Sequence, residues 1–310
     1  MVAGGLPFKN TLIIIAGPTA VGKTSVSIDV AAHFGTEIIS ADSRQFYRGL
    51  TIGTAAPSEL QLSKVKHHFT GNLQPNEYFN VSQFEHKVID LLKDLFKTHR
   101  VVVMSGGSGL YIKAVCEGID EMPDIDKGLR YELTSIYQKE GLPSLRKMLF
   151  ELDPVYAGRV DLANPTRIIR ALEVTMQTGK PYSSHLKSAG AGRDFNIIKI
   201  ALNLPREELH LRISHRVDQM IEQGLIDEAR AFYHLRHLNS LKTVGYKELF
   251  DYFDGKIPLD EAVEKIKTNT RRYARRQITW FKKDKEYNWM PPQSKTVITF
   301  LEESLGNPLT

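Results

Sequence analysis

The sequence predicts an α/β fold in which a parallel sheet is flanked by helices and interrupted by a helical insertion domain. Three short apolar segments, residues 11–16, 37–40 and 101–105, are each followed by a glycine-rich or polar loop and then by a helical pattern. Buried strands that alternate with helices are typical of a parallel sheet covered on both faces. A fourth apolar segment, residues 196–204, continues this pattern after a long helical stretch.

Residues typical of helix ends predict where the helices of the core begin and stop. The first is expected from Lys23 to about Phe34, with Gly35 as its stop. Residues 81–97, "VSQFEHKVIDLLKDLFK", form an amphipathic pattern, and we expect Ser82 and Glu85 to make a capping box at its start.

The middle of the chain is predicted to be a separate helical domain. From about Glu117 to about Arg193 the pattern is helical without a strong strand. Its best-marked helix has Asn164 as N-cap, Pro165 in the first turn and Gly179 as its stop. We therefore expect a core domain of residues 1–117 and 194–310, with basic C-terminal helices, around an insertion of residues 118–193.

Composition narrows the class of protein. The chain has 310 residues, 42% of them hydrophobic and 25% charged, which is ordinary for a globular protein. It contains no apolar run near the roughly 20 residues of a membrane helix, and its start does not read as a signal peptide. Cys116 is the only cysteine, which excludes a disulfide framework and a cysteine-based zinc site. We expect a cytoplasmic protein with no membrane partner.

The segment "GPTAVGKTS" follows the first predicted strand and fits the pattern G-x-x-x-x-G-K-[ST] of nucleotide-binding and ATP-binding loops. Its glycines let several backbone N–H groups face one anion, and the following helix adds its N-terminal dipole. The pattern predicts a P-loop NTPase-like core, with Lys23 on a phosphate and the Thr24 hydroxyl on Mg²⁺. The predicted phosphate cradle comprises Gly17, Pro18, Thr19, Ala20, Val21, Gly22, Lys23 and Thr24. The pattern does not specify which phosphate compound is bound.

Two further loops follow the second and third strands, and the carboxyl ends of parallel strands are where ligands bind. Asp42 lies in the first of them and could be a metal ligand, a general base or a turn cap. Ser108, in "GGSGLY", could be a helix cap. His67 and His68 are adjacent, which is poor spacing for ligands on one helical face, and we interpret them as structural.

The segment 264–285 is strongly basic, with nine lysines and arginines opposed by Glu264 and Asp284. Such a segment is either a solvated helix face or a nucleic-acid contact. Trp280 and Phe281 within it are expected in the core. Arg167 and Arg170 lie three residues apart and share a helix face, where they form either a surface salt-bridged pair or a binding site.

Six motifs together give a more specific indication. The segments "GPTAVGKT", "ADSRQFYRGLTIGTA", "GGSGLYIKA", "NPTRIIRALEV", "TVGYKE" and "RRYARRQITWF" occur in this order between about residues 11 and 285. In this combination the chain resembles the tRNA dimethylallyltransferases, also called tRNA isopentenyltransferases or IPP transferases. The absence of a C-terminal zinc finger makes it similar to the bacterial form.

The resemblance implies an activity. Members of this family transfer the dimethylallyl group of dimethylallyl diphosphate to N6 of the tRNA adenosine just 3′ of the anticodon, with diphosphate as the leaving group. The cradle would then hold a phosphate that is discarded, and Mg²⁺ would be the cofactor. The partner implied is the tRNA anticodon stem-loop, gripped by the insertion domain, and we expect the protein to be a monomer.

The resemblance also implies roles for individual residues. Asp42 is expected to be the catalytic base, assisted by Lys23 and Thr19. The residues expected to bind tRNA are Asp42, Ser43, Arg44, Gln45, Ser108, Arg130, Thr166, Arg167, Ile168, Ile169, Arg170, Arg275, Arg276 and Gln277. Ser108 replaces the family's usual threonine and keeps its hydroxyl, whereas Thr166 replaces a more usual glutamine.

Three alternatives share parts of this pattern. An isopentenyltransferase acting on free adenine nucleotides would need the cradle and Asp42 but not the basic C-terminal helices. A small-molecule kinase would use ATP on the same loop. A non-catalytic RNA-binding protein would use the loop only as a switch, which the set of Lys23, Thr24 and Asp42 disfavours.

Overall fold

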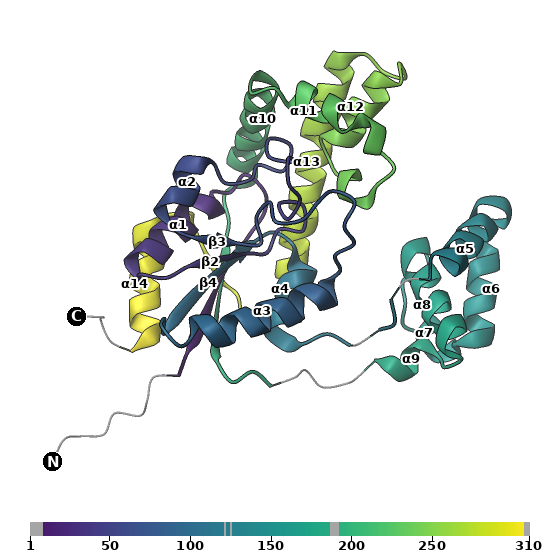
Figure 1. Ribbon diagram of the computed structural model, residues 1–310, viewed down its shortest axis with the longest axis horizontal. Helices are drawn as coiled ribbons and strands as arrows, with labels where there is room; N and C mark the ends of the chain where they lie inside the picture. Colours follow the sequence, from purple (N-terminus) through teal and green to yellow (C-terminus); the bar gives the residue numbers. More distant parts are fainter. Residues whose placement is uncertain (1–8, 121, 125, 187–191, 307–310) are drawn as a thin grey trace. The chain divides into compact units, whose positions relative to one another are not determined.

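The computed structural model describes residues 9–120, 122–124, 126–186 and 192–306. The chain divides into two compact units (Figure 1). The first contains residues 1–116 and 193–310, and the second contains residues 117–192. Each limit lies one residue from the domain limit that the sequence pattern predicts, since the predicted insertion is residues 118–193.

The first unit is built on a six-stranded sheet with the order β3-β2-β4-β1-β5-β6. Every neighbouring pair in it is parallel. The strands are β1 (Thr11–Ala16), β2 (Ile38–Ser40), β3 (His67–His68), β4 (Val101–Gly106), β5 (Asn196–Leu202) and β6 (Asn288–Met290). The α/β class with a parallel sheet flanked by helices is therefore confirmed.

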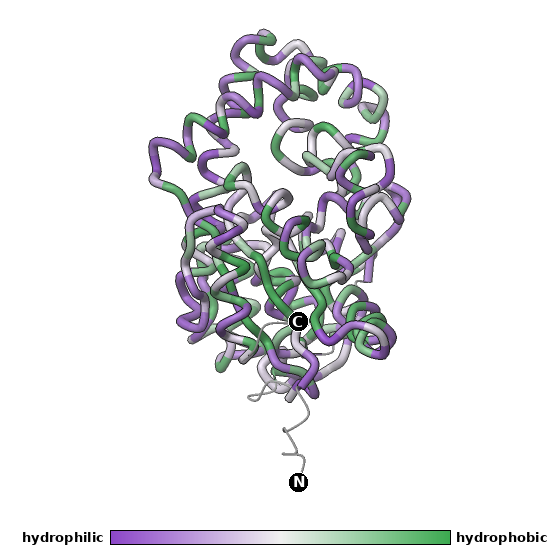
Figure 2. Tube along the Cα trace, turned by 90° about the vertical axis from the view of Figure 1, so that its left-hand side faces the viewer, coloured by the Kyte–Doolittle hydropathy of each residue, from purple (hydrophilic) through white to green (hydrophobic). Residues whose placement is uncertain are grey.

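Strand β1 shows why the sheet is covered on both faces. Its six residues are all buried, and successive side chains of a strand point to opposite faces. Leu12 and Ile14 accordingly belong to one hydrophobic cluster, and Ile13 and Ile15 belong to another. In Figure 2 the strands are mostly coloured hydrophobic, as burial on both faces requires.

Helices of the first unit cover both faces of the sheet. One layer, with α3 and α4, packs on the face of Leu12 and Ile14, and the other, with α1 and α14, packs on the face of Ile13 and Ile15 (Figure 1). The helices are α1 (Lys23–His33), α2 (Glu59–Lys64), α3 (Val81–Leu95), α4 (Gly109–Glu117), α10 (Arg206–Glu222), α11 (Leu225–Ala231), α12 (Tyr246–Phe253), α13 (Leu259–Phe281) and α14 (Ser294–Leu305), with 3-10 turns at Tyr233–Leu235 and Asn239–Leu241.

The predicted capping box of α3 is wrong by two residues. Asn80 is the N-cap, its side chain accepts a hydrogen bond from the N–H of Gln83, and the Gln83 side chain accepts one from the N–H of Asn80. Ser82 lies inside the helix. Glu85 is buried and pairs with Arg193 at 2.6 Å, so its carboxylate forms a buried ion pair instead of capping the helix.

Two short strands escape the sequence analysis. β3 has two residues and β6 has three, which is too short for an alternating pattern to be recognised. Both lie at the edges of the sheet. His67 and His68 form β3, and the His68 imidazole pairs with Glu37 at 2.5 Å, which confirms their structural role.

The second unit is helical and has its own hydrophobic core. Its helices are α5 (Lys127–Glu140), α6 (Leu142–Leu152), α7 (Pro154–Ala157), α8 (Pro165–Thr178) and α9 (Tyr182–His185). Leu133, Leu145, Leu149 and Leu172 are fully buried in its core. The predicted ends of α8 are confirmed: Asn164 accepts from the N–H of Arg167 at 3.2 Å, and Gly179 ends the helix in a left-handed conformation.

Across the described residues, no helix combines the length and the apolar character that a membrane span requires.

Candidate active site

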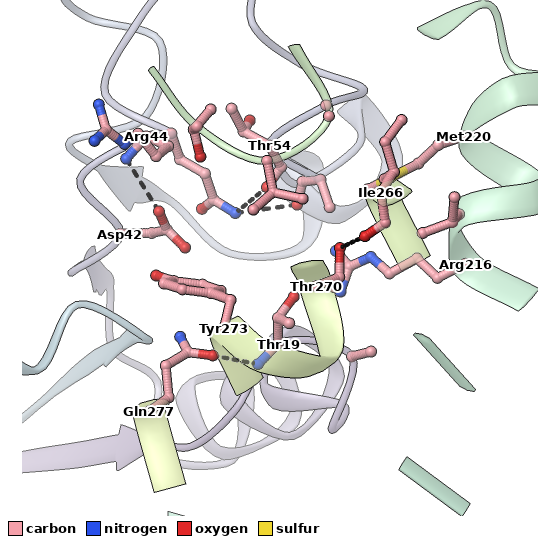
Figure 3. A pocket seen from close by; sticks show the side chains of 18 of the residues that line it. Thr19, Asp42, Arg44, Thr54, Arg216, Met220, Ile266, Thr270, Tyr273 and Gln277 are labelled. Carbon is pink, nitrogen blue, oxygen red and sulfur yellow. Dashed lines mark hydrogen bonds between the residues drawn. The ribbon is translucent and has the colours of Figure 1, made fainter. Parts of the chain in front are cut away.

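A cavity of about 910 Å³ opens in the first unit at the carboxyl ends of the central strands. Its lining comes from the loops after β1 and β2, from α10 and α13, and from the segment before α12 (Figure 3). Strand ends of a parallel sheet place loops that are far apart in sequence beside one another. The cavity therefore contains both the predicted phosphate cradle and Asp42.

The phosphate cradle occupies one end of this cavity. Gly17 has a φ of +150°, and a Cβ there would lie 2.7 Å from the carbonyl oxygen of Leu202, so only glycine fits. Ala20 and Gly22 also have positive φ values, 63° and 106°. Left-handed residues within such a loop turn successive N–H groups into an anion-binding concavity. α1 begins directly after Gly22 and adds its N-terminal dipole.

Two cations lie at the cradle. The Lys23 ammonium donates a hydrogen bond to the carbonyl of Pro18 at 2.8 Å. Burial lowers the pKa of Lys23 to about 8, against the attraction of the Asp42 carboxylate, and the nearby Arg216 guanidinium lowers it further. Burial also lowers the pKa of Arg216, and the attraction of the Asp42 carboxylate opposes this shift. Two half-buried cations beside one concavity make a site suited to a polyanion.

Asp42 lies beyond the end of β2, within electrostatic range of both cations. Its Oδ1 accepts a hydrogen bond from the N–H of Arg44 at 3.0 Å, so one carboxylate oxygen caps the local turn. Tyr273 of α13 lies beside it (Figure 3). Burial, and after it the Asp42 charge, raises the pKa of the Tyr273 phenol, which therefore stays protonated at neutral pH.

The predicted residues around Asp42 are largely engaged with the protein itself. The Ser108 hydroxyl accepts from the N–H of Ser43 at 3.0 Å and donates to the Ser43 hydroxyl at 3.2 Å, so it joins the β2 and β4 loops, while its carbonyl accepts from the N–H of Ile112 at the start of α4. The Arg44 guanidinium donates to the carbonyl of Asn239 at 2.6 Å. The Gln45 amide donates to two carbonyls of residues 54 and 55.

Gln277 holds α13 against the phosphate cradle. Its side-chain oxygen accepts from the N–H of Thr19 at 2.9 Å, and its amide nitrogen donates to the carbonyl of Gly107 at 3.0 Å. The residue is only 5% exposed. A tRNA contact was expected for Gln277, but the structure uses both ends of its amide inside the first unit.

The basic segment covers α13 and the turn after it. Arg275 and Arg276 are exposed, and Arg276 also lines the cavity. Ala274 and Phe281 point into the core, as expected for Phe281, and Trp280 packs against the core. One face of the helix thus binds the sheet while another presents positive charge.

Part of the cavity lining is apolar. It comprises Val217 and Met220 of α10, Leu225 of α11, Ile266 of α13, and Val244, which lies before α12. Such side chains suit a small hydrocarbon group, because they remove it from water without requiring a polar partner.

The predicted tRNA-binding residues of the second unit differ in how far their side chains are exposed. Arg130 and Arg170 both pair with the fully buried Glu173, and Arg170 also donates to the carbonyl of Pro123 at 2.6 Å. Ile168 and Ile169 belong to the hydrophobic core of this unit. The two isoleucine side chains are therefore buried, whereas the side chains of Arg130 and Arg170 remain 32% and 26% exposed beside their ion pairs.

Thr166 and Arg167, in contrast, are exposed in the first turn of α8. They are the most exposed members of the predicted 166–170 set, and Arg170 is half-buried. Asn164, Pro165 and the buried isoleucines fix the helix that presents them.

Sequence reasoning missed several residues of the cavity. The most important are Arg216 of α10, which lies near Lys23 and Asp42, and Tyr273 of α13. The sequence did contain one signal for Arg216, because Arg212 and Arg216 are four residues apart and share a helix face. The many charges along α10 hide that signal. Only the packing of α10 against the sheet selects Arg216.

Comparison with known proteins gives a consistent result. The IPP transferase family model matches residues 45–284. The chain is 53% identical over 285 residues to tRNA dimethylallyltransferase 2 of Azobacteroides pseudotrichonymphae, covering 92% of this chain and 93% of the relative. It is 50% identical to tRNA dimethylallyltransferase 2 of Parabacteroides distasonis, covering 96% and 99%.

A solved structure supports the same grouping. The tRNA isopentenylpyrophosphate transferase of Bacillus halodurans matches with a TM-score of 0.71 and 36% identity, over 96% of this chain and 97% of that one. The fold, the sequence motifs and the matched span agree, and the chain belongs to the IPP transferase family.

Proposed function

We propose that this protein transfers the dimethylallyl group of dimethylallyl diphosphate to N6 of the tRNA adenosine just 3′ of the anticodon, releasing diphosphate. One observation carries the proposal: a single cavity is lined by a phosphate cradle with Lys23 and Arg216, by a group of apolar side chains, and by the Asp42 carboxylate. These three environments match the three parts of the reaction, which are the leaving diphosphate, the hydrocarbon group and the attacking amine.

The chemistry follows from those environments. The bond between the allylic carbon and the diphosphate oxygen breaks, and negative charge grows on the diphosphate. Lys23, Arg216 and the dipole of α1 stabilise that charge where it develops. The allylic cation is resonance-stabilised, so a weak nucleophile such as adenine N6 suffices. As the new C–N bond forms, N6 loses a proton, and the Asp42 carboxylate accepts it.

Mg²⁺ fits this site as a partner of the diphosphate. Mg²⁺ binds through one or two protein oxygens together with substrate phosphates, and needs no dedicated protein cage. The Thr24 hydroxyl lines the cavity beside Lys23 and offers such an oxygen, while the described residues contain no cluster of three or more acidic, histidine or cysteine ligands. When bound, the ion would neutralise part of the charge on the diphosphate.

The proposed binding of tRNA rests on exposed, positively charged side chains. Arg275 and Arg276 would contact phosphates of the anticodon stem-loop, and Thr166 and Arg167 would do so from the second unit, which we assign to gripping the anticodon arm. Removal of the target adenosine from its stack would bring N6 to the cavity. We further propose that the protein works in the cytoplasm as a monomer.

The direct test is incubation with unmodified tRNA and dimethylallyl diphosphate, followed by mass analysis of the nucleosides. The expected product is N6-(dimethylallyl)adenosine at the position 3′ of the anticodon. Parallel incubations replace dimethylallyl diphosphate by ATP, and tRNA by AMP or ADP. Phosphorylated product from ATP would identify a kinase, and prenylated free nucleotide without prenylated tRNA would identify the nucleotide-specific alternative.

A further inference from the structure

A strained turn forms part of the cavity wall. In residues 51–56, the N–H of Ala55 donates to the carbonyl of Ile52, and the N–H of Ala56 donates to that of Thr51, both at 2.9 Å. Ala55 has a φ of +49°, a left-handed conformation that a residue with a Cβ adopts only when its surroundings impose it. Residues 53–55 line the cavity, and Thr54 is seen near Asp42 and Arg44 in Figure 3.

Glu228 of α11 imposes the first half of this turn. Its Oε2 accepts from the N–H of Thr51 at 2.9 Å, from the Thr51 hydroxyl at 2.9 Å and from the N–H of Ile52 at 2.8 Å. Its Oε1 accepts from the N–H of Gly53 at 2.8 Å and from the Tyr246 hydroxyl at 2.6 Å. One carboxylate therefore holds five donors, and hydrogen bonds to an ionised acceptor are about twice as strong as neutral ones.

Gln45 imposes the second half. Its amide nitrogen donates to the carbonyls of Thr54 at 3.1 Å and Ala55 at 3.0 Å, and its oxygen accepts from the Ser40 hydroxyl at 3.3 Å. The N–H of Gln45 donates to the carbonyl of Asp42 at 3.1 Å. The turn is thus bound by an acceptor at its start and by a donor at its end, and the donor belongs to the loop that carries Asp42.

Tyr246 sets the distance between the turn and α12. A Cβ at Gly53 would lie 2.7 Å from two ring carbons of Tyr246, so the backbone of the turn rests directly on the ring. Burial, followed by the Glu228 charge, raises the pKa of the Tyr246 phenol, which keeps its proton for the hydrogen bond to that carboxylate. Tyr246 is fully buried and cannot yield easily.

We propose that Glu228 is a positioning residue for prenyl transfer: through the 51–56 turn and Gln45 it fixes the cavity wall that orients the acceptor adenine toward the allylic carbon. This inference rests on the proposed function. The 51–56 turn lies outside the phosphate cradle. Distortion of this turn should therefore lower the rate of prenyl transfer and leave the affinity for diphosphate largely intact. A residue that only stabilises the fold would show no such separation.

The central variant is Glu228→Gln, which keeps the size of the side chain but replaces one accepting oxygen by an NH₂ group. We expect kcat for tRNA prenylation to fall about 10- to 100-fold, the range for loss of hydrogen bonds to a charged group. The affinity for inorganic diphosphate, measured by calorimetry, should stay within about twofold of wild type, because the cradle does not touch the turn. Glu222→Gln makes the same change at an exposed position of α10 and should retain wild-type kcat.

A rescue experiment separates positioning from general stability. Glycine adopts a positive φ without steric cost. Adding Ala55→Gly to Glu228→Gln should therefore restore part of kcat, with all variants assayed well below their melting temperatures. Tyr246→Phe removes a single donor while keeping the ring against Gly53, and should lower kcat less than Glu228→Gln does. It also provides a folded variant if Glu228→Gln is unstable.

Each outcome bears on the inference. Loss of kcat with diphosphate affinity retained, and recovery in the double variant, would support it. Unchanged kcat in Glu228→Gln, a parallel loss of kcat and diphosphate affinity, or no recovery with Ala55→Gly would overturn it. If the wild-type protein itself fails to prenylate tRNA, the proposed function fails instead, so the two failures are distinguishable.

Discussion

Gln277 and Thr19 are 258 residues apart in sequence, yet the side-chain oxygen of Gln277 accepts a hydrogen bond from the N–H of Thr19 at 2.9 Å. The same amide donates to the carbonyl of Gly107 at 3.0 Å. One side chain of α13 thereby joins the loops that follow β1 and β4. The helix that presents Arg275 and Arg276 to solvent is the helix that holds the phosphate cradle in shape.

Gln277→Ala should therefore affect both stability and diphosphate binding. It leaves a partly buried N–H and a buried carbonyl without their partner, and loss of the partner of a fully buried group costs about 1–3 kcal/mol. We expect a lower melting temperature and a higher KM for dimethylallyl diphosphate. Thr279→Ala, at an exposed position of the same helix, is the control for helix propensity. A melting temperature equal to wild type would show that the Gln277 bonds carry no stability.

The lowered pKa of Lys23 predicts a pH dependence. Because this pKa is about 8 in the folded protein against an ordinary value of 10.5, the folded state holds fewer protons than the unfolded chain between these values. The contribution of Lys23 to stability therefore rises with pH over that range. Diphosphate binding behaves in the opposite way, since it needs the charged ammonium.

Affinity for diphosphate should accordingly fall as the pH rises through about 8, the pKa of Lys23. Binding near that pH should take up a proton, because the bound anion favours charged Lys23. Calorimetry in buffers of different ionisation enthalpy measures this uptake. Lys23→Arg keeps its charge to much higher pH and corrects for titration of the diphosphate itself. Equal proton uptake by both proteins would show that Lys23 does not titrate there.

Asp42→Asn should separate the two ends of the reaction. The amide keeps the size and the hydrogen bond to the N–H of Arg44 but accepts no proton, so turnover should drop by ~10²–10⁴-fold. Binding of dimethylallyl diphosphate should change little. If Asp42 instead held Mg²⁺, diphosphate affinity would fall and recover at high Mg²⁺. Titration of diphosphate binding against Mg²⁺ distinguishes a base from a metal ligand.

Arg216→Gln tests a residue that the sequence did not reveal. Loss of a half-buried cation beside the cradle should weaken diphosphate binding by about 10- to 100-fold, as for hydrogen bonds to charged groups. Arg206→Gln, exposed at the start of the same helix, should bind as wild type does. Equal affinities in Arg216→Gln and wild type would remove Arg216 from the phosphate site.

The exposed pair Arg275 and Arg276 should govern the salt dependence of tRNA binding. Changing both to alanine removes two phosphate contacts, so the slope of log affinity against log salt should become shallower by about 1.5–2. Diphosphate affinity should be unaffected. Lys93→Ala with Lys97→Ala removes two exposed charges, one in α3 and one in the turn after it, and is the matched control. An unchanged slope would make the segment a solvated face.

The sequence alone determined the class of fold, the position of the cradle and the existence of a helical insertion, because these depend on local patterns. The strand of residues 11–16, the glycines of residues 17–22 and the cap at Asn164 each act over a few residues, where chemistry and backbone geometry are directly linked. The family motifs likewise indicated Asp42 and Lys23, whose chemistry is apparent from residue type.

Only the tertiary structure decided which side chains face the cavity and which are used internally. Gln277 and Ile168 look available in the sequence but are buried, and Arg130 is held in an ion pair with the buried Glu173. Arg216 and Glu228 look like ordinary surface charges of helices, yet packing places one beside Lys23 and the other beneath the 51–56 turn. Burial and long-range hydrogen bonds depend on the whole fold, and no local pattern encodes them.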